Sequence, residues 1–475
     1  MAKIKCSSYL RDKIDVMTEL VALLMNYFDY ASILGSDTKG KTFSVTAKAT
    51  SIQDFSGNEC GFVVRVLKAG RYFEYSFNEW DEPEVIFELV KKLYLEDLQI
   101  QRESHLENFD EIMCSDAMIY ESDEKTIQTS LDEIGVATVI EILTKAKDKL
   151  LAFDERIVNA VITLNNVHVS KAFIASCKEL YQGYMYSELM VNATVREGDK
   201  VFSEYQFATG LKGLEVLECL DEKIELAAKG ALELLKSEPL TPGVYDVICT
   251  PLVSGVIAHE AFGHGVEMDM FVKNRALAKN HIGEVVASPL VTMVDGALPK
   301  EEAASYLFDD EGNLGQETVL IEKGILQQGI CDEASGLRLK SKLTGNGRRE
   351  SFERKAYSRM TNTYFEKGES KVEDMIASIR YGFLLDGVNS GMEDPKHWGI
   401  QCVLAKAKEI VDGQLTGRIF APVILTGYVP ELLKSITMVS DEVVLHGGGS
   451  CGKGYKEWVK VSDGGPYLKA KARLG

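Results

Sequence analysis

The chain of 475 residues is too long for one ordinary hydrophobic core, so two or three domains are expected. Hydrophobic residues make up 45% and charged residues 26%, which is the balance of a globular rather than a disordered protein. The formal net charge of −19 argues against nucleic acid as a partner, because its phosphates must be neutralised by Lys and Arg.

The first half of the chain is predicted to alternate helices and strands. Apolar residues at helical spacing predict a helix over residues 9–33. Further helices are expected at 84–96 and 134–150, and strands at 42–50 and 61–77, the latter turning at Ala69-Gly70. From Arg156 the pattern becomes β, with strands over 156–171 and 183–210 and a turn at Glu197-Gly198-Asp199 that predicts an antiparallel hairpin.

A main domain boundary is predicted after a helix over residues 220–237. The breaker run EPLTPG at 238–243 divides the chain into domains 1–238 and 239–475, although it could also be a loop inside one domain. A further break near 100–130 would divide the first domain into two subdomains. The second domain is predicted to open with a strand at 243–250 and a short helix at 252–264, followed by short β runs. The expected class is α+β: an N-terminal mixed domain with an antiparallel sheet, then a β-rich domain that carries the metal-site helix.

The sequence also argues against a membrane protein and a secreted one. The most apolar stretch, 247–266, is interrupted by His259, Glu260 and His264, which a membrane span would tolerate poorly. No apolar run follows the first lysines, so no secretory signal is expected. The nine cysteines form no C-x-x-C pair, which favours reduced thiols in the cytoplasm over a disulfide framework.

The segment HEAFGH at 259–264 carries the most specific chemical pattern. A peptidase metal site needs neutral imidazole ligands, an open position for water and a carboxylate that takes the water's proton. His259 and His264 are the predicted ligands, and Glu260 is the predicted general base. The competing interpretation is a pair of hydrogen-bonded core histidines, with Glu260 as a cap or an ion-pair partner.

The spacing of the two histidines requires a distorted helix. It is one residue longer than in H-E-x-x-H, so on an ideal helix His264 would lie roughly 140° from His259. A π-bulge would bring the two imidazoles together, because pairing from i to i+5 returns the fifth residue over the first. Alternatively, the helix ends at Gly263 and Gly265 lets the chain turn His264 back.

The glycine-rich stretch 446–454 offers a candidate third ligand. Its glycines, including Gly448 and Gly449, allow close approach of another backbone and leave Cys451 on an uncrowded loop; a thiolate is a good zinc ligand. Gly448 and Gly449 are therefore candidate substrate-binding positions, with a plain tight turn as the alternative. A nucleophilic Cys paired with His446, or a phosphate loop, matches the pattern less well. Arg348 could clamp a substrate carboxylate or belong to a solvated face.

The chain resembles the TldD/PmbA family of peptidases and, because its metal motif is intact, the active TldD branch. The resemblance covers most of the chain after about residue 252. The segment GMEDPKHWGIQ at 391–401 and the tail after Gly465-Pro466 depart from the family pattern, which bears on substrate preference and partner contacts. The blocks that carry the resemblance are HEAFGHGVEMD at 259–269, IGEVVASPLVTMVDGALP at 282–299, LFDDEGN at 307–313, TGNGRRESF at 344–352, SRMTNTYFEKG at 358–368 and GGGSCGK at 447–453.

The resemblance implies a zinc site and an activity. Members of this branch bind Zn²⁺ through the two His of H-E-x-x-x-H, here His259 and His264, and through a Cys of the glycine-rich loop, here Cys451. The motif Glu, here Glu260, is implied as the general base. The implied activity is proteolysis of unfolded proteins or small peptides, including peptide maturation. The implied assembly is a homodimer, or a heterodimer with a paralogous subunit, around an enclosed chamber.

The sequence therefore predicts a zinc-dependent peptidase that uses metal-activated water and a Glu general base. Extended peptide is expected to add to an exposed strand edge near the glycine-rich loop. The competing hypothesis is a non-catalytic peptide-binding or assembly subunit whose metal is structural, which requires four protein ligands and no open position. A modulator of a DNA enzyme is suggested only by the family's historical naming.

Overall fold

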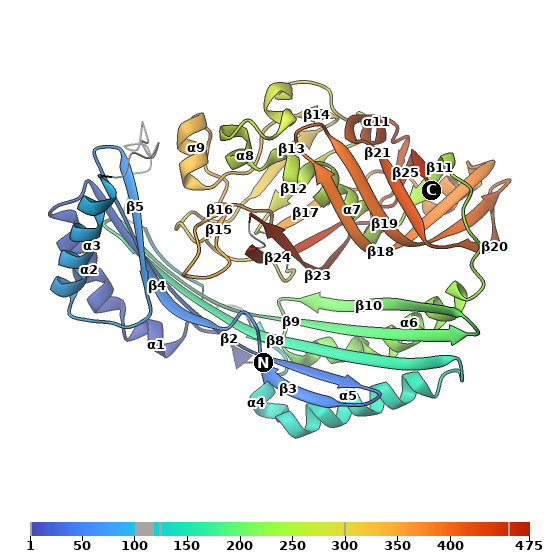
Figure 1. Ribbon diagram of the computed structural model, residues 1–475, viewed down its shortest axis with the longest axis horizontal. Helices are drawn as coiled ribbons and strands as arrows, with labels where there is room; N and C mark the ends of the chain where they lie inside the picture. The colour runs from blue at the N-terminus through green and yellow to red at the C-terminus, as the bar shows by residue number, and fades with distance from the viewer. Residues whose placement is uncertain (1, 100–117, 123–125, 299–300, 455–456) are drawn as a thin grey trace.

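The computed structural model describes residues 2–99, 118–122, 126–298, 301–454 and 457–475. The predicted α+β class is confirmed: Figure 1 shows a long N-terminal sheet on one side and a β-rich C-terminal half on the other. The predicted break near 100–130 falls largely outside the described residues. The boundary at 238/239 stays a prediction. None of the helices in the described part of the chain has both the length and the apolar character needed to cross a bilayer.

The N-terminal half is built on an eight-stranded sheet. Its strands follow the order β10-β9-β8-β2-β4-β5, with β3 against β2 and β6 against β9. All of these pairs are antiparallel except β6 with β9. The strands are β2 (Tyr30–Thr46), β3 (Thr50–Asp54), β4 (Glu59–Lys68), β5 (Arg71–Phe77), β6 (Met118–Ser122), β8 (Ile157–Ala175), β9 (Lys178–Glu197) and β10 (Lys200–Gly210).

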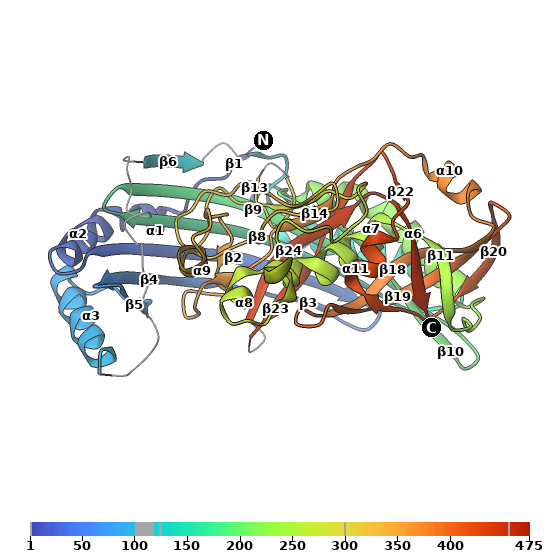
Figure 2. The same ribbon diagram turned by 90° about the horizontal axis from the view of Figure 1, so that it is seen from above.

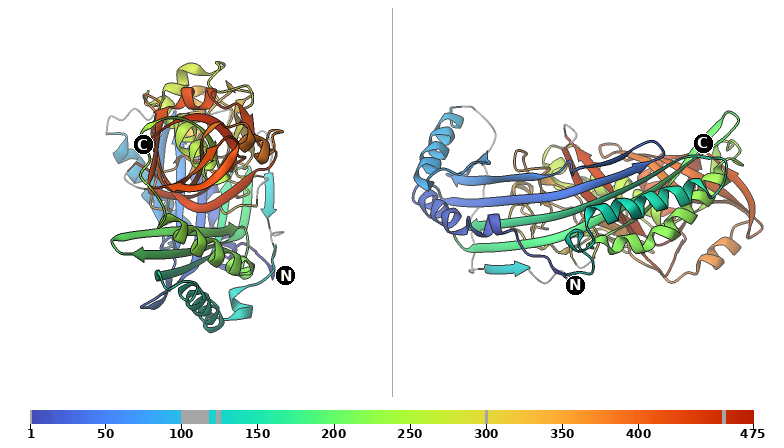
Figure 3. Two further views of the ribbon diagram at one scale, coloured as in Figure 1. Left: turned by 90° about the vertical axis from the view of Figure 1, so that its right-hand side faces the viewer. Right: turned by 90° about the horizontal axis from the view of Figure 1, so that it is seen from below.

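Helices cover both ends of this sheet (Figures 1 and 3). Near one end lie α1 (Ser8–Arg11), α2 (Ile14–Met25) and α3 (Pro83–Asp97), and near the other α4 (Leu131–Ile134), α5 (Val136–Leu151) and α6 (Leu220–Leu234). Each long helix buries one apolar stripe; in α5 it is Val139, Leu143, Ala146 and Leu150. The short elements are β1 (Ala2–Lys3), which pairs with β7 (Thr126–Ile127), and the 3-10 helix η2 (Leu214–Cys219).

Two sequence expectations for this half meet different outcomes. The turns at Ala69-Gly70 and at Gly198 are confirmed, with positive φ at all three residues. The helix predicted over residues 9–33 is wrong beyond Met25, because β2 begins at Tyr30. Residues 30–38 are all buried between β4 and β8, and a fully buried run fits both periods, so strand pairing decides its conformation.

Five strands of the C-terminal half close into a barrel, visible end-on in Figure 3. The ring runs β11-β18-β19-β21-β25 and closes because β11 also pairs with β25. Its interior holds buried apolar side chains such as Val247, Phe383 and Leu404. The strands are β11 (Gly243–Cys249), β18 (Tyr381–Asp394), β19 (Gly399–Val411), β21 (Val423–Tyr428) and β25 (Leu468–Leu474), extended by β20 (Gln414–Phe420) and β22 (Met438–Val439), with α10 (Val372–Ala377) and α11 (Val429–Lys434) outside.

A six-stranded sheet lies beside the barrel, in the order β14-β13-β12-β17-β24-β23. Seen from above in Figure 2, its end strands lie over the middle of the N-terminal sheet, where β23 contacts β10. The strands are β12 (Met293–Gly296), β13 (Glu317–Glu322), β14 (Ile325–Leu326), β17 (Asn362–Phe365), β23 (Val444–Lys453) and β24 (Glu457–Gly465); β15 (Gly347–Arg348) and β16 (Tyr357–Ser358) form a separate ribbon, and α9 (Glu333–Leu339) lies nearby.

The helical segment between barrel and sheet carries the sequence motif. It consists of α7 (Pro251–Val256), the π-helix η3 (Ile257–Gly263), the 3-10 turn η4 (His264–Val266), α8 (Met268–Val272) and the 3-10 turn η5 (Leu277–His281). The π-helix contacts β18 and β19 of the barrel on one side and β17 and β24 of the sheet on the other. Its burial between two β layers fixes the direction of each motif side chain.

Candidate metal centre

The π-helical turn brings the two histidines together. The backbone N–H of His264 donates to the carbonyl oxygen of His259, which is the i to i+5 bond of a π-helix. Their imidazole centroids lie 5.0 Å apart, with the ring planes at 90°. Of the two distortions that the sequence left open, the π-bulge is the one found. The chain continues into η4 and does not end its helix at Gly263.

Cys451 completes a group of three ligand atoms. It lies on β23, and its Sγ is 3.3 Å from Nε2 of His264. One ligand atom each from His259, His264 and Cys451 lies within 4.8 Å of the other two. A tetrahedral zinc ion with bonds of about 2.0–2.3 Å spaces its ligands roughly 3.5 Å apart, so this donor set fits such an ion.

The electrostatics of the three groups suit a cation-binding thiolate. Burial opposes ionisation of Cys451, but the imidazoles of His264 and His259 outweigh it and lower the pKa of the thiol to about 4. Burial likewise opposes protonation of His264, yet the Glu267 carboxylate and the Cys451 thiolate raise its pKa well above its usual value. A positive charge is therefore stabilised among these side chains, which is what a bound metal ion would supply.

A second set of side chains orients His264. Its Nδ1 lies 3.1 Å from Oε2 of Glu267, so the imidazole is held by a carboxylate on the side away from Cys451. Lys453 lies 3.0 Å from the same oxygen and 2.6 Å from Asp269. Burial would raise the pKa of Glu267, but Lys453, His264 and Arg359 lower it to about 2. Glu267 is thus a permanent anion behind the imidazole.

Glu260 is positioned as a free carboxylate beside this group. It is half-buried and forms no hydrogen bond or ion pair within the described residues. Gly391 of β18 lies against it: a Cβ on Gly391 would be 3.0 Å from Cδ of Glu260 and closer still to its Cγ. The glycine therefore provides the space that the Glu260 side chain occupies.

The site opens into a cavity of about 1080 Å³. Its walls include His259, Glu260, His264 and Cys451, the strand edge 389–393 of β18, and residues 450–454 at the end of β23 and just after it. Within the described part of the chain, no fourth His, Cys, Asp or Glu joins the three ligand atoms. Three protein ligands would be fewer than the four that a structural zinc site uses.

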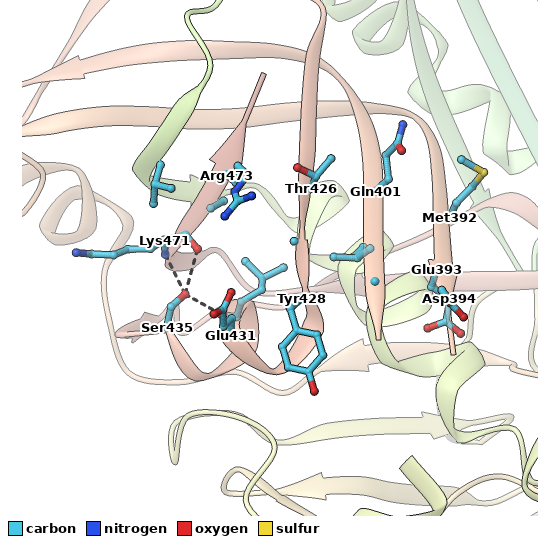
Figure 4. A pocket seen from close by; sticks show the side chains of 16 residues that line it. Met392, Glu393, Asp394, Gln401, Thr426, Tyr428, Glu431, Ser435, Lys471 and Arg473 are labelled. Atoms are coloured by element: carbon cyan, nitrogen blue, oxygen red, sulfur yellow. Dashed lines mark hydrogen bonds between the residues drawn. The ribbon is translucent and has the colours of Figure 1, made fainter. Parts of the chain in front are cut away.

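Glu393, in the segment that departs from the family pattern, is a second unpartnered carboxylate of this cavity. Both of its oxygens are buried without a hydrogen-bond partner in the described residues, and burial raises its pKa well above its usual value. Glu393 and Met392 also line a neighbouring cavity of about 880 Å³ on the outside of the barrel (Figure 4). The two cavities thus adjoin at the end of β18.

The remaining predicted site residues lie elsewhere. Gly448 packs against the N-terminal sheet: a Cβ there would be 2.8 Å from the ring of Phe207. Gly449 is exposed on β23, two residues before Cys451. Arg348 does not line the cavity; its guanidinium donates to the backbone carbonyls of Met360 and Lys460. Substrate binding by these three residues stays a prediction.

Sequence reasoning did not single out Glu267 or Gly391. Glu267 is inside the motif block, three residues after His264, a spacing that could have suggested a helical partner for the imidazole. Gly391 comes from a strand far along the chain, and no local pattern links it to Glu260.

Comparisons with known proteins found a metallopeptidase family model and relatives that are named metalloproteases. Residues 242–472 match the family described as PmbA/TldA metallopeptidase C-terminal domain. A metalloprotease of Methanocaldococcus jannaschii is 29% identical over 96% of this chain and 99% of its own length. A metalloprotease TldD homolog of Haemophilus influenzae is 31% identical over 71% of this chain and 72% of its own. The crystal structure of TldE from Thermococcus kodakarensis has the same fold, with a TM-score of 0.73 at 18% identity, covering 97% of this chain and 99% of its own.

Proposed function

Since the chain belongs to the TldD/PmbA metallopeptidase family, we propose that it is a zinc-dependent peptidase that hydrolyses unfolded or small peptides. One observation carries the proposal. Two imidazoles and a thiolate converge beside an unpaired carboxylate, Glu260, on the wall of an open cavity. A structural metal would need a fourth protein ligand there, and the described residues offer none.

Each residue has a distinct task in the proposed reaction. His259, His264 and Cys451 would hold zinc, which supplies Lewis acidity toward a water and a peptide carbonyl. Glu260 takes a proton from the attacking water as its oxygen bonds to the carbonyl carbon. The same carboxyl then gives the proton to the amine as the C–N bond breaks. Glu267 holds His264 in the orientation that leaves its Nε2 free for the metal.

Two strand edges are available to bind an extended peptide. β23 is the end strand of its sheet, and among the described strands Gly449–Lys453 pairs only with β24. β18 pairs with β11 only up to Leu385, so no described strand pairs with its stretch 389–393 on the side away from β19. Residues 450–453 of β23 and 389–393 of β18 line the cavity. A peptide that added to the edge of β23 would pass its backbone close to Cys451.

The assembly and the compartment are part of the proposal. We expect a dimer, either of two copies or with a paralogue of the kind represented by TldE. Neither nucleic acid nor membrane is expected as a partner. We expect the cytoplasm as the compartment, because seven of the eight described cysteines are free thiols; Cys177 is the exception and is disulfide-bonded.

Metal removal and restoration test the proposal. The chelated protein should keep its fold, lose hydrolysis of an unstructured peptide, and regain it with one equivalent of Zn²⁺. Cys451→Ala should not regain it, whereas Cys249→Ala, which removes another buried thiol, should. The structural-metal hypothesis would replace the proposed function if the metal-free chain unfolds and the zinc-reloaded chain cleaves no peptide, either alone or mixed with its paralogue.

A further inference from the structure

The metal-site cavity carries a large apolar side chain that the proposed mechanism does not use. Trp458, on β24, lines the cavity and is 51% exposed. Met392, on β18, lines it too and is 61% exposed. Exposed apolar surface inside a cavity favours a ligand that covers it.

A glycine places the Trp458 ring over β23. Trp458 pairs with Gly452 across the two strands. A Cβ on Gly452 would lie 3.1–3.3 Å from three carbons of the indole. The ring therefore extends from β24 across the space that a side chain at position 452 would fill, toward the open edge of β23.

The pleat of β23 relates this ring to the metal centre. Successive side chains of a strand point to opposite faces. Cys451 points toward His264, so Gly452 and the indole of Trp458 lie on the other face of the two strands. In a peptide added to the edge of β23, the residue opposite Cys451 passes nearest the metal ligands. Its neighbour, opposite Gly452, directs its side chain to the face that bears the indole.

We infer that Trp458 forms a subsite for an apolar or aromatic side chain of the peptide residue next to the cleaved bond. The inference rests on the proposed function, since it takes the peptide to lie along β23. The indole is a flat, rigid partner for such a side chain. A small peptide residue at this position would leave the ring uncovered, and an acidic one would place a charge against it. Met392 adds a thioether surface within the same cavity.

Binding to a non-cleaving variant tests the subsite separately from catalysis. Zinc-loaded Glu260→Ala is titrated with unstructured peptides that differ only in carrying Phe, Ala or Asp at one position. The Phe peptide should bind about tenfold more tightly than the Ala peptide and change the tryptophan emission. Trp458→Phe in the same background should lose the emission change and keep the preference for Phe. Equal affinity for all three peptides would overturn the inference.

Two further variants show whether the ring itself is responsible. Trp458→Ala should remove the preference for Phe while leaving binding of the Ala peptide unchanged. Gly452→Ala should do the same with the indole still present, because its methyl group displaces the ring. Leu415→Ala, on the exposed surface of β20, is the control and should keep the preference. If Trp458→Ala weakened all peptides equally, the ring would only support the strand. If the binding preference holds but the wild-type chain cleaves nothing, the subsite stands and the proposed reaction fails.

Discussion

Glu260 lies where it does because a glycine on a distant strand leaves room for it. Gly391 contacts the Cγ and Cδ region of the carboxylate side chain, and the space between them would not hold a methyl group. The Glu260 carboxylate is otherwise unrestrained by hydrogen bonds within the described residues. Its position relative to the metal ligands therefore depends on backbone packing between β18 and the π-helix.

Replacing this glycine should separate metal binding from catalysis. In Gly391→Ala the new methyl displaces Glu260, and a misplacement of about 1 Å can cost roughly 100-fold in rate. Zinc content, measured by metal analysis, should stay at the wild-type level, because the ligands do not touch Gly391. Gly427→Ala, in the same barrel with nothing near its Cβ, is the matched control. Full activity in Gly391→Ala would show that the base tolerates displacement.

Glu267 is predicted to set the zinc affinity. Glu267→Gln removes the anion that orients His264, and loss of such a partner weakens metal binding about 10–100-fold. Competition with a fluorescent chelator measures this directly. Asp269→Asn is the control, since it also removes a carboxylate from Lys453 but has no contact with an imidazole. Equal losses in both variants would mean that Lys453, not the imidazole, carries the effect.

At the scale of the element, the π-helix is the feature that the sequence reveals most directly. Two candidate ligand histidines at positions i and i+5 do not share a face of a regular α-helix, so the motif itself implies the distortion. That β2 begins as early as Tyr30 could not be predicted in the same way. Its apolar run satisfies the helical and the strand period alike, and only its pairing with β4 and β8 selects one.

The positions of Gly391 and Trp458 relative to the site also escape sequence reasoning. Both act through contacts with residues on other strands, one with Glu260 and one with Gly452. Such contacts follow from strand register, which depends on the whole barrel and sheet. The candidate metal ligands are easier to predict from the sequence, because His259 and His264 share one turn and Cys451 is the one cysteine of a glycine-rich run.

The π-helix depends on close packing at Gly263. A Cβ there would lie 3.3 Å from Cε of Met360 and closer to its Sδ. Gly263→Ala should therefore destabilise the fold by about 1–3 kcal/mol, the usual cost of overpacking. Urea unfolding of Gly263→Ala, Met360→Ala and the double variant forms a cycle. The double variant should be less destabilised than the sum of the two singles. Strict additivity would show that the two side chains do not compete for space.

At the scale of the whole molecule, buried ion pairs join the N-terminal sheet to the C-terminal half. Arg65 lies 2.6 Å from Glu311, Lys171 pairs with Asp310, and Arg349 pairs with Glu74. Carboxyl groups in the same region are buried, and their hydrogen bonds and positive neighbours do not fully offset the cost of burying a negative charge. Burial raises the pKa of Glu59 to about 7, of Asp309 to about 7 and of Glu311 to about 8. Arg65 and Glu311 therefore form a full ion pair only above about pH 8, and we expect the carboxyl groups of this junction to titrate near neutral pH.

Stability should fall as the pH rises through this range. These three carboxyls bind protons in the folded state that the unfolded chain has already released above about pH 4–5. Below that pH their contribution to the free energy of unfolding is fully present. It is lost as the pH rises through 7–8, and the loss is on the order of a few kcal/mol. Thermal unfolding from pH 6 to 9 should show a falling Tm, and Glu311→Gln should flatten the slope. Glu141→Gln, on the exposed face of α5, should leave it unchanged. A Tm that rises over this interval would contradict the assignment.

The central claim is that Glu260 is the base of a catalytic zinc site. The most direct test measures zinc content and hydrolysis of an unstructured peptide for the wild-type chain and for Glu260→Ala, each alone and with a paralogous partner. We expect about one zinc per chain in both proteins, with cleavage by the wild type only. Zinc-loaded Glu260→Ala that cleaves as fast as the wild type would contradict the role of Glu260, and a wild-type chain that binds no zinc would contradict the site itself.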